Sequence, residues 1–518
     1  MSATSSFSTS PPAPTQENTL TDAALDATRW NYAGFVSRGA AALVVGTILA
    51  RLLGPKPFGQ VAVATIVFGL ANLIADAGFS SALIQIPELS ERQIRVAFTM
   101  QILVGFLMTS LVWLIAPAVS AAFRDPGALD VIRAVSPLFV LQSLGQTSTG
   151  LMKRHMRFRS LQMAQVLSYL IGYAGVGIVM AYTGYGVWSL VTAQLFQALL
   201  YSLMAYTNVR HPLRPYLDRA GFRVLRFGVQ VTSANILNWS IFNLDNILVG
   251  RRFGSTYLGL YSRSFNLAIT PVEGFVTACQ QVLFTSCSKV EQQFDRMSRA
   301  YLAAAAGVSL VTMPVFWSLS TSSQIVIGAL FGPRWNEAVP LFAAFAVAMP
   351  FFALMAIAGP ILGAADRVNL EIRTQAISLG FTAAVFFIAS RTSLLAVAWA
   401  VPLVYAFRFW FITQPTLRLL GLRWCDLFTA MAGPAFVASV TTACVFCASR
   451  IIGVTVKPGI ALVGLAAFGL IAAAVAAYLC GSRLLPSVLA NPLRARVENA
   501  PSWMVYFLRP FLYSSFLL

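Results

Sequence analysis

The chain has 518 residues, of which 58% are hydrophobic and only 10% are charged, and its mean hydropathy is +0.73. A soluble domain carries about 25% charged residues, so these values exclude an ordinary soluble protein and indicate a polytopic α-helical membrane protein. A membrane barrel is also excluded, because barrel strands alternate apolar and polar residues whereas the apolar runs here are continuous. We attribute most of the net charge of +18 to basic cytoplasmic loops, with an anionic substrate as the second explanation.

Residue types that bind metals are scarce. The six Cys lie in or beside apolar runs, and the only two His, His155 and His211, lie in basic loops. We therefore expect packing thiols, no metal site and no cofactor. Residues 1–28 are rich in Ser, Thr and Pro and lack the basic start of a signal peptide, which predicts a disordered cytoplasmic tail.

Fourteen apolar segments, each long enough to cross a membrane as a helix, follow this tail. They lie near residues 30–50, 58–86, 94–121, 128–151, 160–182, 184–207, 227–249, 257–286, 300–331, 336–363, 369–390, 392–416, 424–449 and 458–481. With the N-terminus in the cytoplasm, most Lys and Arg fall in cytoplasmic loops, so the charge bias places both termini there. The end of the chain, 483–518, is predicted to be a cytoplasmic and interfacial tail.

A short basic turn occurs twice, 200 residues apart. The stretches 50–61, "ARLLGPKPFGQV", and 250–261, "GRRFGSTYLGLY", carry one Arg and two Gly at the same spacing. Weaker matches recur in the same order, pairing 136–139 with 339–342, 160–165 with 369–375, and 186–190 with 397–401. Six spans return the chain to the same side, which predicts two parallel six-helix lobes that enclose a central cavity and rock for alternating access. The predicted boundaries are 29–210 and 211–420 for the lobes and 421–482 for two further helices.

Three stretches resemble a known family. They are "NLDNILVGRRFGSTYLGLYSRSFNLAITP" (243–271), "RFRSLQMAQVLSY" (157–169) and "GYGVWSLV" (184–191). The chain resembles the Wzx-type polysaccharide transporters of the multidrug/oligosaccharidyl-lipid/polysaccharide exporter superfamily, over residues 30–482. The resemblance implies a flippase that moves undecaprenyl-diphosphate-linked oligosaccharide repeat units, for lipopolysaccharide, O-antigen or exopolysaccharide, across the bacterial inner membrane. It also implies a polysaccharide polymerase and a chain-length regulator as partners, and no nucleic acid.

Ionisable side chains within apolar spans are costly and are functional candidates by default. Arg263, Asn266, Thr270 and Glu273 fall on one face of the span at 257–286. Two other spans carry similar polar faces, formed by Asn31 and Arg38 in the first and by Asn235, Asn238 and Asp245 in the seventh. Because a polar face is unfavourable in lipid, we expect these side chains to line the cavity between the lobes.

Our hypothesis assigns the substrate diphosphate to two arginines, since a guanidinium group binds phosphate through paired hydrogen bonds. Arg38 would receive the diphosphate on the cytoplasmic side, and Arg263 would stabilise it nearer the outer side. Asp245 and Glu273 would pair with Arg263 in the empty site or couple a cation. The alternative is a purely structural salt bridge between Arg263 and one of these acids. Asp76 is a candidate for gating or ion coupling, or else caps a broken second span.

Two other basic features have simpler interpretations. Arg408 is expected to reach the headgroups from the inner end of its span. The basic loop 153–159 is expected to set the topology, with contact to anionic lipid heads or to the diphosphate as the alternative. The sequence has no Walker motif, so we expect H⁺, Na⁺ or the membrane potential, rather than ATP hydrolysis by this chain, to drive transport.

Two competing functions are a cation-coupled multidrug exporter of the same superfamily and a membrane polysaccharide polymerase or ligase. A site for cationic drugs favours an excess of acids, whereas Arg and acids are balanced within the spans. The outer loops are short and poor in His and acids, which is unfavourable for general acid–base catalysis. We therefore predict a transporter rather than an enzyme.

Overall fold

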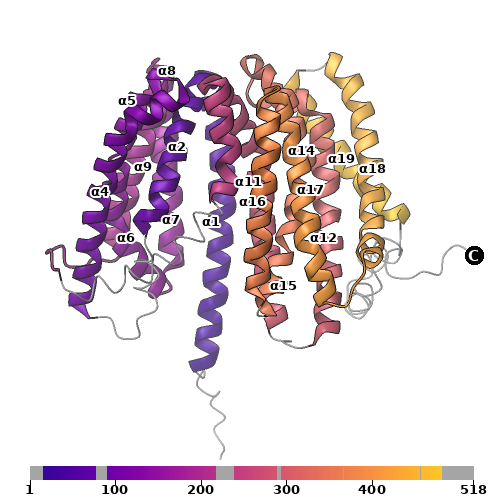
Figure 1. The fold of residues 1–518 in the computed structure, drawn as a ribbon, viewed down its shortest axis with the longest axis horizontal. Coiled ribbons are helices and arrows are strands. Elements are labelled where there is room, and N and C mark those ends of the chain that lie inside the picture. Colours follow the sequence, from indigo (N-terminus) through magenta and orange to yellow (C-terminus); the bar gives the residue numbers. More distant parts are fainter. Residues whose placement is uncertain are drawn as a thin grey trace, which may run out of the picture.

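The computed structural model describes residues 16–76, 90–217, 239–288, 293–365, 367–455 and 457–480. Over these ranges the chain forms helices joined by turns, with no strand. The predicted all-α fold is therefore confirmed. Figure 1 shows the helices running up and down one common direction in two groups, which follow each other in the sequence.

The first group, called the N-lobe, begins with a long helix. Its elements are α1 (Gln16–Leu53), α2 (Pro55–Asp76), α4 (Glu91–Phe123), α5 (Pro126–Val135), α6 (Leu138–Arg154), α7 (Phe158–Tyr169), the π-helical turns η1 (Leu170–Gly177), α8 (Ile178–Tyr182) and α9 (Val187–Asn208). The helix α1 begins inside the segment 1–28 that was predicted to be a tail, so residues 16–28 are helical. The segments α7, η1 and α8 form one continuous rod.

The second group, called the C-lobe, starts with helical residues 239–253. It continues with α11 (Ser255–Ser288), α12 (Phe294–Thr321), α13 (Ser323–Leu330), η2 (Pro333–Ala338), α14 (Val339–Ala356), α15 (Ala358–Ala364), α16 (Val368–Ser390) and α17 (Leu394–Leu419). Two more helices follow, α18 (Trp424–Thr455) and α19 (Pro458–Cys480). The helix α18 packs against α12, and α19 packs against α18 and α13.

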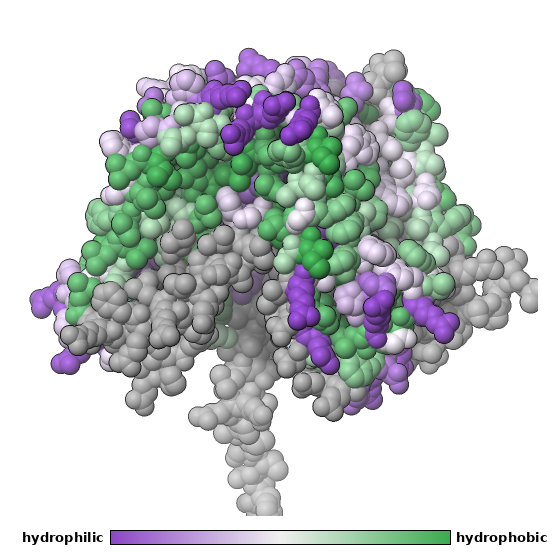
Figure 2. Space-filling view, viewed as in Figure 1, coloured by the Kyte–Doolittle hydropathy of each residue, from purple (hydrophilic) through white to green (hydrophobic). Residues whose placement is uncertain are grey.

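Twelve helices in the described part of the chain are long and apolar enough to cross a membrane. They coincide with twelve of the fourteen predicted spans. Of the other two, the segment 227–249 lies partly outside the described residues and is helical from 239 onward, and the segment 369–390 is occupied by α16. Figure 2 shows a broad hydrophobic band across one face, with hydrophilic residues gathered along its upper edge. Such a band is what a lipid-facing surface requires.

Local sequence explains several helix ends. The Ser90 hydroxyl accepts the N–H of Gln93 at 3.3 Å, and the Gln93 side chain accepts the N–H of Ser90 at 2.9 Å. This reciprocal capping box begins α4. Gly54 and Gly254 follow helix ends with φ values of 73° and 90°, which glycine adopts without strain. Each of the two repeated turns therefore has a glycine with a positive φ directly after the helix end.

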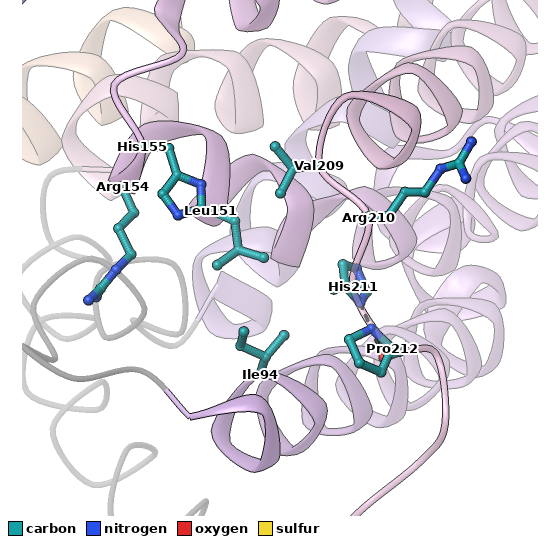
Figure 3. Close-up of a pocket in the computed structure, with 8 residues that line it drawn as sticks. All are labelled: Ile94, Leu151, Arg154, His155, Val209, Arg210, His211 and Pro212. Carbon is teal, nitrogen blue, oxygen red and sulfur yellow. Dashed lines mark hydrogen bonds between the residues drawn. The ribbon is translucent and has the colours of Figure 1, made fainter.

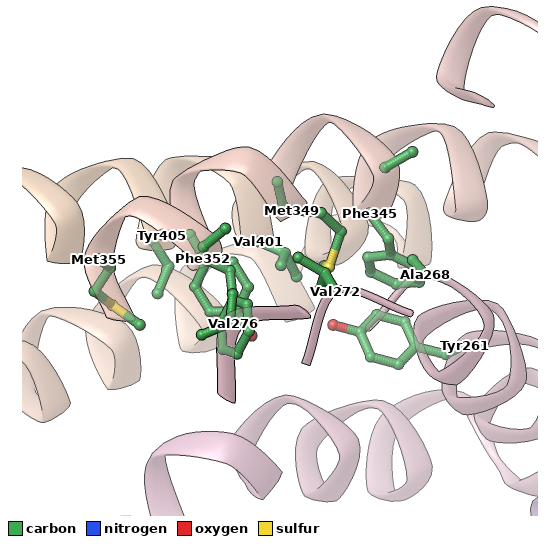
Figure 4. Close-up of a cluster of buried hydrophobic side chains, with 14 of the residues drawn as sticks. Tyr261, Ala268, Val272, Val276, Phe345, Met349, Phe352, Met355, Val401 and Tyr405 are labelled. Atoms are coloured by element: carbon green, nitrogen blue, oxygen red, sulfur yellow. The ribbon is translucent and has the colours of Figure 1, made fainter. Parts of the chain in front are cut away.

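The C-lobe is built around α14, whose residues are mostly buried. This helix packs against α11, α12 and α17. Figure 4 shows Phe345 and Phe352 of α14 packed towards Tyr261 of α11 and Tyr405 of α17. The Tyr261 ring meets the Phe345 ring edge-on, with centroids 4.9 Å apart. This apolar core fixes the position of α11, the helix with the predicted polar face.

The lobes meet mainly through α2 and α11. Contact is closest at the end of the molecule that carries the two repeated turns, called the turn end. A Cβ atom on Gly59 would lie 1.6 Å from the Ser255 carbonyl oxygen, and a Cβ on Gly259 would lie 2.1 Å from that of Pro55. Only glycine permits this backbone approach. The repeated glycines of the two lobes therefore pack against each other.

Side chains of both lobes close the turn end further. Arg51, at the end of α1, donates to the carbonyl oxygens of Ala329 and, at 2.9 Å, Leu330. In return, the indole N–H of Trp335 donates to the carbonyl oxygen of Ala50 at 2.9 Å. Towards the opposite end, Figure 1 shows the N-lobe helices leaning away from the C-lobe, with α1 between the two groups.

Candidate functional site

Two side-chain hydrogen bonds join α1 to α7. The Asn31 side-chain oxygen accepts the amide of Gln162 at 2.8 Å, and Arg38 donates to the side-chain oxygen of Gln165 at 2.6 Å. Gly34 makes room for the first pair, because a Cβ there would lie 2.2 Å from the Gln162 side-chain oxygen. Asn31 and Arg38 therefore face the same neighbouring helix, as their seven-residue spacing requires.

Arg263 lies between the lobes near the turn end. Its guanidinium group is over the rings of Phe58, at 5.1 Å from the centroid, and Phe331, at 5.6 Å. On α1, only a glycine leaves space for it, because a Cβ on Gly46 would lie 1.9 Å from a terminal nitrogen of Arg263. The stacked rings of Tyr169 and Tyr173, 4.9 Å apart, lie within electrostatic range of the guanidinium. The buried Nε atom has no hydrogen-bond partner among the residues that the structure describes.

The rest of the predicted face of α11 continues from Arg263 towards the opposite end. Asn266, Thr270 and Glu273 are exposed. On the surface of α11 they lie beside two residues that contact α1. Gly274 lies against the ring of Phe35, and Gln281 accepts a hydrogen bond from the Tyr32 hydroxyl at 3.1 Å. The polar face of α11 thus runs beside α1, in the space between the lobes.

Asp245 lies apart from Arg263, inside the C-lobe. Its carboxylate accepts the Tyr261 hydroxyl at 2.8 Å and the backbone N–H of Asn246 at 2.7 Å. The side chain is only 5% exposed. Among the described residues, neither Asp245 nor Glu273 forms an ion pair with Arg263. The salt bridge considered from the sequence is therefore not formed in this conformation.

Arg408 was expected to reach the headgroups, and this expectation is wrong. Its side chain is only 4% exposed and lies inside the C-lobe. It donates to the side-chain oxygen of Gln375 at 3.1 Å and lies over the ring of Phe242, at 5.4 Å from the centroid. The packing of α17 against α16 turns Arg408 inward, where Gln375 and the rings replace water around the charge.

The polysaccharide biosynthesis protein family model matches residues 48–340, which is more than half of the chain. The chain belongs to this family. It is similar to the lipopolysaccharide biosynthesis protein WzxC of Escherichia coli K12, with 22% identity over 68% of this chain and 72% of that protein. It is also similar to the succinoglycan biosynthesis transport protein ExoT of Rhizobium meliloti, with 28% identity over 58% of this chain and 61% of that protein.

Two solved structures show the same fold. The lipid II flippase MurJ, in an inward closed conformation, matches with a TM-score of 0.73 over 87% of this chain and 98% of that chain, at 13% identity. An inward-facing multidrug resistance transporter of the MATE family matches with a TM-score of 0.59 over 75% of this chain and 98% of that chain, at 14% identity. The two-lobe arrangement is therefore shared with transporters of the superfamily that the sequence resembles.

Some predicted residues lie outside what the structure describes. Asn235 and Asn238 are outside the described residues, and Asp76 ends α2 while its side chain is not described. Conversely, sequence reasoning missed Gln165 and Gln375 as partners of Arg38 and Arg408. Each of these glutamines is the last residue of its segment in the repeat that pairs 160–165 with 369–375, so the repeat already indicated that the two positions are related.

Proposed function

We propose that this protein is a flippase that moves lipid-linked oligosaccharide repeat units, carried on a polyprenyl diphosphate such as undecaprenyl diphosphate, across the bacterial inner membrane. Membership of the polysaccharide biosynthesis protein family supports this proposal. So do the relative ExoT, a succinoglycan biosynthesis transport protein, and the structural neighbour MurJ, a lipid II flippase. The proposal makes the chain a transporter rather than a polymerase, ligase or drug exporter.

The observation that carries the proposal is the environment of Arg263. A guanidinium group that is enclosed between two lobes without an acidic partner among the described residues leaves a positive charge uncompensated. Such a charge is costly in a medium of low dielectric constant unless an anion binds it. A diphosphate supplies several negatively charged oxygens that match the planar fork of an arginine.

The substrate would meet the two arginines in order. With the N-terminus in the cytoplasm, as the charge bias of the loops favours, the turn end faces the periplasm and the closed Gly59–Gly259 contact corresponds to an inward-facing state. Arg38 would then receive the diphosphate from the cytoplasmic side, and Arg263 would bind it just below the closed turn end. Rocking of the lobes about α2 and α11 would release it outside.

Transport needs a driving force and proteins that use the translocated repeat units. Asp245 and Glu273 are the acids that lie well inside predicted spans of the C-lobe, and a proton or Na⁺ bound there, or the membrane potential, would bias the two conformations. A polysaccharide polymerase and a chain-length regulator would take up the translocated repeat units, because polymerisation consumes the product of flipping.

The test uses cells in which the gene is deleted and then restored as variants. Arg38→Ala and Arg263→Ala should each abolish polymer export and leave lipid-linked repeat units on the cytoplasmic face, with normal amounts of protein in the membrane. Arg391→Ala is a matched control, because Arg391 is exposed and its guanidinium lies over Phe387 outside the site. Full export by both site variants would refute the assignment.

A further inference from the structure

A cavity of about 250 Å³ lies in the N-lobe at the end opposite the turn end. It lies between α4, α6 and the segment that follows α9 (Figure 3). The residues that line it are Ile94, Leu151, Arg154, His155, Val209, Arg210, His211 and Pro212. We call it the histidine pocket, because it contains both histidines of the chain. Nothing in the flipping mechanism uses this pocket.

His211 supplies a buried polar atom that lacks a partner within the described part of the chain. The side chain is only 6% exposed, and its Nε2 atom forms no hydrogen bond with a described residue. The other ring nitrogen, Nδ1, lies 3.3 Å from the Pro212 carbonyl oxygen. The ring is held between Phe98 of α4, at 4.9 Å between centroids, and Tyr206 of α9, at 5.5 Å. His211 thus brings to the lining of the cavity an enclosed polar atom that calls for a further partner.

The charges around His211 select the type of ligand. The charged and titratable groups that line the pocket with His211 are Arg154 at the end of α6, His155 directly after it and Arg210, and Tyr206 of α9 contacts the ring, while α4 contributes only the apolar Ile94 to the lining. Among the residues that the structure describes, no acid lines the pocket. Figure 3 shows Arg154 and Arg210 on opposite sides of the two imidazole rings, with their guanidinium groups directed away from the cavity. The resulting field favours an anion.

The backbone carbonyl groups at the end of α9 have partners other than the two histidines and Arg210. Arg157 donates to the Asn208 carbonyl oxygen at 3.0 Å, and the Ser148 hydroxyl donates to that of Val209 at 3.0 Å. The end of α9 is thus satisfied by residues other than the two histidines and Arg210. An anion with several acceptor oxygens remains the best match for the pocket.

We propose that the histidine pocket binds a phosphate group, supplied by the headgroup of an anionic phospholipid. The pocket combines basic and imidazole groups with apolar walls from Ile94, Leu151 and Val209, which fit the glycerol and the first carbons of a lipid chain. It lies at the end that the charge bias assigns to the cytoplasm, where polybasic segments meet anionic lipid heads. All its residues belong to the N-lobe side, so the inference does not depend on the substrate site between the lobes.

The experiment measures thermal unfolding of the purified full-length protein in a neutral detergent. Dihexanoyl phosphatidylglycerol, dihexanoyl phosphatidylcholine and inorganic phosphate are titrated separately. His211→Phe keeps the ring packing and removes Nε2, and Arg210→Gln removes an exposed charge at the rim. Arg296→Gln is the matched control, because Arg296 is exposed at the same end of the C-lobe.

Phosphatidylglycerol should raise the melting temperature of the wild type and of Arg296→Gln more than phosphatidylcholine does. Each pocket variant should weaken the apparent affinity about tenfold or more, as the loss of one charge-assisted hydrogen bond implies. If His211→Phe does not fold, Arg210→Gln decides alone. Equal stabilisation of the wild type and Arg210→Gln, or none by any ligand, would overturn the proposal. Stabilisation by inorganic phosphate alone would overturn the lipid as the source and keep the phosphate site.

Discussion

Replacing Gly59 with alanine should separate the two lobes at the turn end. The new Cβ would lie 1.6 Å from the carbonyl oxygen of Ser255, whereas real Cβ atoms essentially never approach closer than 3.0 Å. The helices must therefore move apart by at least about 1.4 Å, the difference between these distances. The obstacle is helical backbone, which cannot rotate away as a side chain can.

The size of the effect follows from the cost of overpacking. Inserting a methyl group into a closely packed contact costs about 1–3 kcal/mol. Only the conformation with the turn end closed carries this cost, so the ratio of closed to open molecules should fall about 5- to 150-fold. The hydrogen bonds of Arg51 and Trp335 across the same interface would lengthen or break with it.

Double electron–electron resonance can measure this separation. Spin labels at Tyr185→Cys and Thr392→Cys, in a background without native cysteines, report the distance between exposed turns of the two lobes at the turn end. Gly59→Ala should shift the distribution to longer distances. Gly307→Ala should not, because a Cβ there meets no atom within 4 Å. An unchanged distribution in folded Gly59→Ala would refute the reasoning.

Three further predictions concern other parts of the molecule. Burial lowers the pKa of His211 below its ordinary value of 6.5, so the unfolded chain binds more protons than the folded chain. The ligand-free protein should therefore lose stability as the pH falls below about 6.5, and His211→Phe should lose less. Equal melting curves of the two proteins from about pH 7.5 to 5.5 would contradict this. Arg408→Ala should destabilise the protein by about 2–3 kcal/mol, because Gln375 loses a charged donor; an unchanged melting temperature would show that this hydrogen bond contributes nothing. Ser90→Ala should cost about 1 kcal/mol and speed amide hydrogen exchange in the first turn of α4, whereas Thr65→Ala, whose hydroxyl bonds only within its own helix, should leave that turn unchanged.

Much of the fold follows from the sequence because few backbone structures are stable in lipid. A continuous apolar run in a bilayer must satisfy its own backbone hydrogen bonds, so its length alone predicts a helix. The repeated Arg and Gly pattern likewise predicted a repeated turn, and Gly54 and Gly254 have the same left-handed conformation. The start of α1 was missed, since residues 16–28 are too polar to be recognised as part of a spanning helix.

The candidate site was less predictable. Helical spacing placed Asn31 and Arg38 on one face of α1, but it did not identify Gln162 and Gln165 as their partners. The same spacing brought Asp245 into consideration with Arg263, whereas Asp245 is bound by Tyr261 within the C-lobe. Periodicity defines the face of a single helix; the helix that packs against this face depends on the other helices of the bundle.

The sequence by itself determined the class of the protein, the spans, the repeat and the few charges at membrane depth, because each of these depends on local composition and spacing. Only the tertiary structure decided that Gly59 and Gly259 pack the two lobes together and that Arg263 lies among aromatic rings, with no acid beside it in the described part of the chain. It also decided that Arg408 points inward and that both histidines share one pocket. Each of these features joins residues that are far apart in the chain. Close packing between helices brings such residues together, and no short stretch of sequence encodes that packing.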